Sequence, residues 1–212
     1  MNLVDHVIKS FNRANTFQSK LPSFVFEMEG MSGAKTRIFY NELCSIEFEG
    51  RQTEYLEVGT WKGSTLCSAL CFNSNCHATV IENWSEFNGP KDEFKINIEK
   101  IDVGERLTVF EEDVFSFDTG KITKPIDIYL YDGAHDDESH FKAITHVWPV
   151  LANEAIIIID DWNSYPIRKA TFDALASVGE CVIQKFEVTY TLDGSHTPMP
   201  IAQMEFWNGI GV

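Results

Sequence analysis

The stretch YLEVGTWKGST, residues 55–65, decides the fold of this chain. It opens with a short apolar strand in which Tyr55, Leu56 and Val58 are hydrophobic. A glycine-bearing turn follows, and the pattern predicts a helix that begins near Ser64. A strand that runs through a tight turn into a helix is typical of parallel sheets whose faces are covered by helices.

This turn has the features of a ligand-binding site. Gly59 and Gly63 can adopt positive φ and let a ligand approach the backbone, and the first N–H groups of the new helix point above the strand end. The carboxylate of Glu57, just before the turn, would repel a pyrophosphate and attract a cationic amine. The spacing Glu-x-Gly-x-x-x-Gly also differs from the dinucleotide pattern Gly-x-Gly-x-x-Gly. The alternative is a tight connection without a ligand.

Further apolar segments predict more strands of the same sheet, and acids follow several of them. The segments are residues 78–81, 107–110, 126–131 and 155–159, and the last, AIIII, has the strongest signal for a buried strand. Parallel strands end at one edge of a sheet, so the acids at these ends are expected to share a crevice. These acids are Glu57, Glu82, Asp132, Asp160 and Asp161.

Glu82 stands 25 positions after Glu57, as one strand–helix–strand unit requires. Nucleotide-binding folds place an acid here to hold ribose hydroxyls, which a carboxylate accepts in a bidentate way. The alternative is an ordinary solvated acid at a strand end.

Three carboxylates, Asp132, Asp160 and Asp161, are expected to converge from two neighbouring strand ends. They would repel one another unless a cation lies between them, and hard oxygen ligands favour Mg²⁺, Ca²⁺ or Mn²⁺ over zinc. We therefore predict a divalent cation, Mg²⁺ by preference. The alternative is that Asp132 and Asp160 cap helices or bind a cofactor without metal.

His135 follows the strand of residues 126–131 and is the best candidate for a general base. A neutral imidazole can take the proton of an acceptor hydroxyl, and its unperturbed pKa lies close to working pH. With Asp132, it makes up the predicted catalytic pair. The competing interpretation is a histidine that only starts a helix.

With these residues in view, the chain resembles the class I S-adenosylmethionine-dependent methyltransferases. The resemblance implies that Gly59, Thr60, Gly63 and Ser64 surround the methionine part of the cofactor, with Glu57 near its ammonium group. Asp113 matches a position that often contacts adenine in this family. Met31 and Ser32 lie in a segment that packs over the cofactor in related O-methyltransferases, although a plain turn before a helix explains them equally well.

Within that class, the acidic strand ends resemble two groups. The Asp at one strand end and the Asp pair at the next are similar to the divalent-metal site of catechol-type O-methyltransferases, where the second residue of the pair is commonly Asn. Asp161 departs from that pattern and leaves the metal's identity open. The DGxH sequence and the strand ending in an acidic pair and Trp look more like the macrolide-sugar methyltransferase group. This resemblance covers about residues 28–175.

Composition limits the other possibilities. A net charge of −15 argues against a nucleic-acid partner, because binding to phosphates needs a basic surface. No secretion signal or apolar run of membrane-spanning length is seen, and five cysteines suit free thiols, so we predict a cytoplasmic protein without a membrane partner. Cys67 and Cys71 are expected to lie on a buried helix face rather than bind metal.

The predicted fold is one α/β domain with a doubly wound, mostly parallel seven-stranded sheet and an antiparallel C-terminal hairpin. Residues 1–50 are expected to form a helical cover and residues 51–212 the core. Met204, Phe206 and Trp207 in the last strand are expected to be buried. The chain stops within an apolar run, so we expect a few C-terminal residues to be missing. The sequence leaves a homo-oligomer open.

The predicted function is methyl transfer from S-adenosylmethionine to a small-molecule acceptor, most plausibly a hydroxyl, with help from a divalent cation. One alternative is an NAD(P)-dependent oxidoreductase on the same type of sheet, which Glu57 and the glycine spacing disfavour. The other is a cofactor-binding module without catalysis. The acceptor cannot be named from the fold, because this fold serves many substrates.

Overall fold

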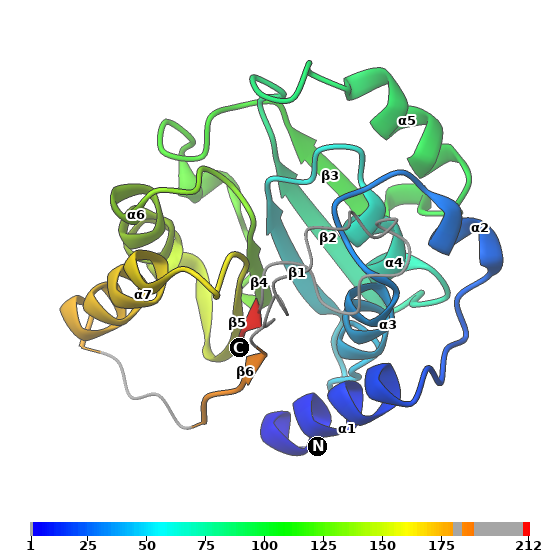
Figure 1. Ribbon diagram of the computed structural model, residues 1–212, viewed down its shortest axis with the longest axis horizontal. Helices are drawn as coiled ribbons and strands as arrows, with labels where there is room; N and C mark the ends of the chain where they lie inside the picture. The colour runs from blue at the N-terminus through cyan, green and yellow to red at the C-terminus, as the bar shows by residue number, and fades with distance from the viewer. Residues whose placement is uncertain (1, 180–183, 189–209) are drawn as a thin grey trace, which may run out of the picture.

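A parallel sheet forms the centre of the molecule (Figure 1). The computed structural model describes residues 2–179, 184–188 and 210–212. Five parallel strands stand in the order β3-β2-β1-β4-β5. Their bounds are β1 (Thr53–Val58), β2 (Cys76–Ile81), β3 (Leu107–Phe110), β4 (Ile126–Tyr131) and β5 (Leu151–Ile159). The helices are α1 (Leu3–Asn15), α2 (Ser23–Glu27), α3 (Ala34–Leu43), α4 (Ser64–Leu70), α5 (Lys91–Glu99), α6 (Asp137–Val147) and α7 (Tyr165–Ser177). The predicted α/β fold with a parallel sheet is therefore confirmed.

Beyond β5, two strands of two residues each continue the sheet. They are β6 (Glu187–Val188) and β7 (Ile210–Gly211), and β7 pairs antiparallel with both β5 and β6. Most of the predicted hairpin, with Met204, Phe206 and Trp207, lies outside the described residues. The complete hairpin therefore stays a prediction.

Helices cover both faces of the sheet because its strands alternate between two apolar sets. On β4, Ile128 and Leu130 belong to the core under α1, α3 and α4, whereas Tyr129 and Tyr131 belong to the core under α6 and α7. Figure 1 shows α6 and α7 on one side of the sheet and α3 and α4 on the other. Burial on both faces explains why the strands read as nearly continuous apolar runs.

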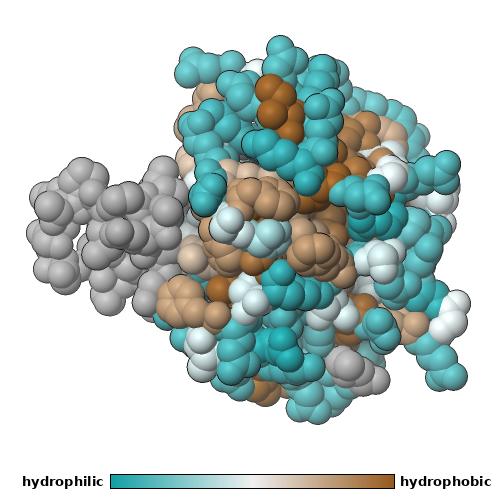
Figure 2. Space-filling model, turned by 90° about the vertical axis from the view of Figure 1, so that its right-hand side faces the viewer, coloured by the Kyte–Doolittle hydropathy of each residue, from teal (hydrophilic) through white to brown (hydrophobic). Residues whose placement is uncertain are grey.

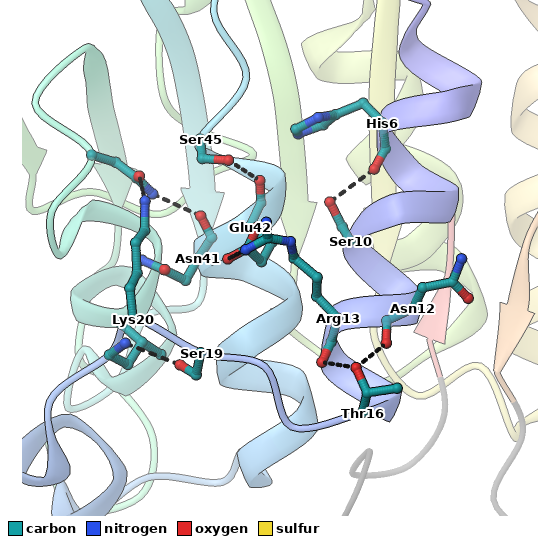
Figure 3. Close-up of polar contacts among 12 residues, drawn as sticks. His6, Ser10, Asn12, Arg13, Thr16, Ser19, Lys20, Asn41, Glu42 and Ser45 are labelled. Carbon is teal, nitrogen blue, oxygen red and sulfur yellow. Dashed lines mark hydrogen bonds and ion pairs between the residues drawn. The ribbon is translucent and has the colours of Figure 1, made fainter.

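Helix α1 is held to α3 by an aromatic pair and an ion pair, and a serine hydroxyl bonds back within α1. Phe11 of α1 stacks on Phe39 of α3 with ring centroids 4.2 Å apart. Arg13 of α1 pairs with Glu42 of α3 at 3.2 Å, and Ser10 donates to the carbonyl of His6 (Figure 3). Helices α1, α2 and α3 all fall within residues 1–50, where a helical cover is predicted. The grouping of residues 1–212 into one domain stays a prediction.

The register between β4 and β5 brings two acids to the same level. Tyr131 pairs with Ile159, so Asp132 and Asp160 are the first residues beyond the last pair on the two strands. At the other end of these strands, a single residue of β4 faces residues 152–155 of β5, which bulge out of the ladder. The bulge explains why β5 begins at Leu151, four residues before the predicted start.

Polar side chains dominate the face that carries α2 and α5, with hydrophobic ones between them (Figure 2). Ile96 of α5 is 55% exposed. Cys44, Cys67, Cys71 and Cys76 are buried free thiols, as predicted, and Cys181 lies outside the described residues. Among the helices of the described residues, none is both long and apolar enough to cross a membrane.

Candidate active site

A cavity of about 790 Å³ opens over the carboxyl ends of β1, β2, β4 and β5. This volume lies in the range of small-molecule sites. Backbone hydrogen bonds hold the strand ends together beyond the strands themselves: the N–H of Asp132 donates to the carbonyl of Val58 (2.9 Å), and that of Asp160 to Tyr131 (3.1 Å). The cavity is lined by most of the predicted site residues: Met31, Gly59, Thr60, Ser64, Glu82, Asp113, Asp132, His135, Asp160 and Asp161.

The glycine turn has the geometry that a bound ligand requires. Gly59 and Gly63 have φ of +86° and +81°, a conformation that favours glycine. A Cβ atom on Gly59 would lie 1.8 Å from the carbonyl oxygen of Asp132, so this position also needs glycine because β4 comes so close. The hydroxyl of Thr60 is buried, makes no hydrogen bond of ordinary geometry among the described residues, and lies close enough to Glu57 to lower the pKa of that carboxyl. A hydroxyl of the cavity wall that is bonded so weakly can bind a polar ligand.

Glu57 is fully buried beneath the turn and does not line the cavity. Its two carboxylate oxygens accept hydrogen bonds from the hydroxyls of Tyr55 (2.5 Å) and Thr65 (2.7 Å). Burial raises the pKa of Glu57 in spite of these two donors. The structure thus places Glu57 next to the turn, and its contact with a cofactor ammonium stays a prediction.

Glu82 lies in the cavity wall and holds two backbone amides. Its Oε2 accepts from the N–H of Trp61 (3.1 Å) and its Oε1 from the N–H of Trp84 (2.7 Å). Each carboxylate oxygen retains a lone pair that can accept a ribose hydroxyl. Asp113 also lines the cavity and caps its own turn through the N–H groups of Phe115 (2.9 Å) and Ser116 (3.2 Å).

The carboxyls of Asp132 and Asp160 are partly buried and interact with each other at the two strand ends. Burial raises the pKa of Asp132 well above its usual range, and the neighbouring Asp160 raises it further. Burial and the charge of Asp161 raise the pKa of Asp160 to about 7. Each of the two carboxyls is therefore harder to ionise than an isolated aspartate.

His135 forms an ion pair with Asp161 through its Nδ1. This contact raises the pKa of His135 against the opposing effect of burial. With Nδ1 held by the carboxylate, Nε2 of the neutral ring is left as the acceptor of a proton. Asp161 itself has φ of +54°, so the backbone turns sharply where its side chain meets His135.

The predicted metal site of Asp132, Asp160 and Asp161 stays a prediction. Among the described residues, no three His, Cys, Asp or Glu side chains are placed to hold a metal ion. Asp132 and Asp160 interact with each other, while Asp161 contacts His135. Repulsion between the carboxylates, which led to the prediction, contributes here to the raised pKa values of Asp132 and Asp160.

An aromatic rim of the cavity was missed by reasoning from the sequence. Trp61 and Phe87 meet edge to face with ring centroids 6.5 Å apart, and both line the cavity with Trp84. All three have positive φ, between 46° and 49°, which is unusual for large side chains. The tryptophan inside the glycine turn was the available signal.

The comparisons with known proteins agree with this geometry. Residues 56–162, just over half of the chain, match the family described as Methyltransferase domain. None of the curated protein sequences compared with the chain matches it.

Several solved structures share the fold at low sequence identity. The O-methyltransferase TomG from Streptomyces achromogenes, in complex with S-adenosylmethionine, is 12% identical with a TM-score of 0.60, over 97% of this chain and 87% of TomG. The Bacillus cereus O-methyltransferase with S-adenosylhomocysteine is 14% identical with a TM-score of 0.54, over 99% and 88% of the two chains. The S-adenosylhomocysteine-bound Podospora anserina methyltransferase PaMTH1 is 11% identical with a TM-score of 0.56, over 98% and 86%.

The glycine turn, the cavity above it and the matched segment lead to one conclusion: this chain is an enzyme that belongs to the family described as Methyltransferase domain.

Proposed function

We propose that this enzyme transfers the methyl group of S-adenosylmethionine to a hydroxyl of a small-molecule acceptor. The observation that supports it most is the meeting, in one cavity, of a glycine turn and a histidine held by an aspartate. Two of the similar structures, TomG and the Bacillus cereus protein, are named as O-methyltransferases.

The proposed cofactor-binding residues lie in the cavity wall or next to it. Those in the wall are Met31, Gly59, Thr60, Ser64, Glu82 and Asp113; Gly63 of the turn, Ser32 of the cover segment and Glu57 beneath the turn lie behind it. Of these, Glu82 offers the lone pairs for ribose.

His135 is the proposed general base. Asp161 holds its Nδ1, so Nε2 is the atom that takes the proton from the acceptor hydroxyl. When bound, S-adenosylmethionine supplies an electrophilic methyl group, so the protein must mainly align the two reactants and remove one proton. Asp132 and Asp160 fix the edge of the cavity beside this histidine.

The divalent cation is the separate, untested part of the prediction. To gain three carboxylate ligands, a cation would have to part Asp132 from Asp160 and Asp161 from His135. Turnover after EDTA treatment, with and without added Mg²⁺, is the direct test. Turnover that stays unchanged by EDTA would refute cation assistance and leave His135 as the proposed base.

Binding of the cofactor comes first in the test of the function. In a thermal-shift titration, S-adenosylhomocysteine at about 100 times its dissociation constant should stabilise the fold by roughly 2.7 kcal/mol. NAD serves as the control and should give no shift. A panel of hydroxyl compounds is then incubated with the enzyme and S-adenosylmethionine. Mass spectrometry identifies as acceptors the compounds that gain about 14 daltons, the difference between CH₃ and H. A shift with NAD alone would contradict the proposal.

A further inference from the structure

Arg37 of α3 is a buried cation that the proposed chemistry does not yet use. It is 2% exposed, and no ion pair with a carboxylate is recorded for it among the described residues. Burial lowers its pKa to about 10, so the guanidinium stays charged at neutral pH. Burying a charge costs free energy unless dipoles or an anion compensate it, so the groups that surround Arg37 must supply this compensation.

The guanidinium binds the segment that covers the glycine turn. Its NH1 group donates to the carbonyls of Val25 (2.6 Å) and Phe26 (3.1 Å). Its Nε donates to the carbonyl of Ser32 (3.2 Å) and to the hydroxyl of Ser32 (3.0 Å). Arg37 thus holds both ends of the segment of residues 25–32 through hydrogen bonds.

From Ser32 the hydrogen bonds continue to the cavity. The hydroxyl of Ser32 lies 3.0 Å from the hydroxyl of Ser64, and Ser64 lines the cavity. Because Nε of Arg37 already donates to the Ser32 oxygen, the Ser32 hydrogen is available to Ser64. In that direction the Ser64 hydrogen is left to donate to a ligand, and each bond in such a chain polarises the next.

The cover segment, residues 25–32, packs closely against the glycine turn and Ser64. A Cβ atom on Gly30 would lie 2.0 Å from the Ser64 hydroxyl oxygen, so this position leaves no room for a side chain. Lys62 of the turn pairs with Glu29 of the cover segment at 2.8 Å. Both contacts keep Ser32 within hydrogen-bond distance of Ser64.

The negative charge of the cavity lining makes the hydrogen-bond donors Arg37, Ser32 and Ser64 important for binding an anionic group. Its described lining includes seven carboxylate side chains and no lysine or arginine. An anionic group placed there would be repelled by the acids, so it needs a donor backed by positive charge. The cofactor carries such a group, the carboxylate of its methionine part, and the turn that contains Ser64 is where that part is expected.

We propose that Arg37 is a positioning residue: it holds the hydroxyls of Ser32 and Ser64 in the orientation in which they bind and select the carboxylate of the cofactor. This inference rests on the proposed function, because it assumes that S-adenosylmethionine occupies the cavity. It assigns a role to a residue outside the glycine turn and outside the cavity wall.

The test compares two ligands that differ only in the amino-acid part. S-adenosylhomocysteine carries the carboxylate, whereas 5′-methylthioadenosine lacks the whole amino-acid end. Ser32→Ala should weaken binding of S-adenosylhomocysteine by about 5- to 30-fold in calorimetry and leave the affinity for 5′-methylthioadenosine unchanged. Arg37→Met should give the same selective loss, and Arg37→Lys, which keeps the charge, a smaller one.

The matched control is Ser10→Ala, which removes another buried serine hydroxyl far from the cavity on α1 (Figure 3). It should leave both affinities unchanged. If Arg37→Met does not fold, Ser32→Ala and Ser64→Ala still test the chain of hydroxyls. Equal loss of both ligands, or no loss of either, would overturn the inference while the proposed function stands. A wild-type protein that binds neither ligand would overturn the proposed function and this inference with it.

Discussion

Two aspartates, the buried Asp127 and the partly buried Asp132, stand at opposite ends of β4 and have opposite surroundings. Asp127, near the start, accepts two hydrogen bonds from the guanidinium of Arg51, both 2.7 Å long, and one from the N–H of Glu54 (2.9 Å). Asp132, just past the end, faces the carboxyl of Asp160 and has no cation beside it among the described residues. One strand therefore carries an acid paired with a cation at one edge of the sheet and an acid repelled by neighbouring carboxyls at the other.

The difference separates a structural role from a functional one. A carboxylate with a bidentate arginine has all it needs to stabilise the fold. Two carboxyls pressed together destabilise the fold, and proteins keep such clusters mostly where a ligand or a reaction uses them. The contrast leads to four predictions.

The largest expected effect is on catalysis at the carboxyl edge. His135→Ala should lower kcat by about 100- to 10,000-fold, because the acceptor hydroxyl loses its general base. The measurement is steady-state methyl transfer to an acceptor found by screening. His77→Ala, on β2 and away from the cavity, is the control and should retain full activity. Comparable kcat values for His135→Ala and wild type would exclude His135 as the base.

The next effect is on stability and differs between the two aspartates. Asp127→Asn should lower the free energy of unfolding by about 1–3 kcal/mol, because Arg51 and the amide of Glu54 lose their acceptor. Asp132→Asn should lower it by much less or raise it, since an amide can still donate to Asp160 and cannot ionise beside it. Urea unfolding at pH 7 measures both. The comparison fails if the second variant is the less stable one.

A smaller effect concerns the buried His140 of α6, which packs edge to face on Tyr131. Neither ring nitrogen has a partner among the described residues, and burial lowers its pKa to about 4. The unfolded chain therefore binds a proton at about pH 6.5 and the folded chain only near pH 4. As pH falls through that window, the free energy of unfolding should decrease by up to about 1.4 kcal/mol per pH unit.

The variant His140→Phe isolates this contribution. The raised pKa values of Asp132 and Asp160 act with the opposite sign, because the folded chain then binds the proton first and gains stability as pH falls. The difference in unfolding free energy between wild type and His140→Phe removes that background. A difference that does not change between pH 6.5 and pH 4.5 would show that His140 is not buried as a neutral ring.

The smallest expected effect is a shift of the pH–rate profile. Asp161 raises the pKa of His135, and only the neutral ring can accept a proton, so activity should rise as pH increases through that raised pKa. In Asp161→Asn the charge is lost, and the acid limb of kcat/KM should move to lower pH. An acid limb at the same pH in both proteins would mean that another group controls it.

The strand ends could be predicted from the sequence because burial on both faces leaves a plain signal. The runs 126–131 and 155–159 had to be central strands, and their following acids had to meet at one edge. Asp132 and Asp160 do meet there, and the helix after the glycine turn does begin at Ser64. Position along a parallel sheet is thus readable without coordinates.

The partners of those acids were not predictable in the same way. That Glu57 would be bound by Tyr55 and Thr65, and Asp161 by His135, depends on rotamers and on a backbone turn at positive φ. Helix α2, of only five residues, is too short to leave a periodic pattern. Contacts that tertiary packing decides are hidden from local sequence patterns.

The bulge at residues 152–155 has a consequence for how this protein can be altered. It lies at the far end of β5 from the cavity, and Asn153 and Glu154 within it are exposed. The pairs from Ile128 with Ile156 to Tyr131 with Ile159 then set the level of Asp160 independently of the bulge. Added residues at 153–154 would therefore lengthen a surface loop and leave the acids aligned, which makes this loop a natural place to attach a label or a second protein.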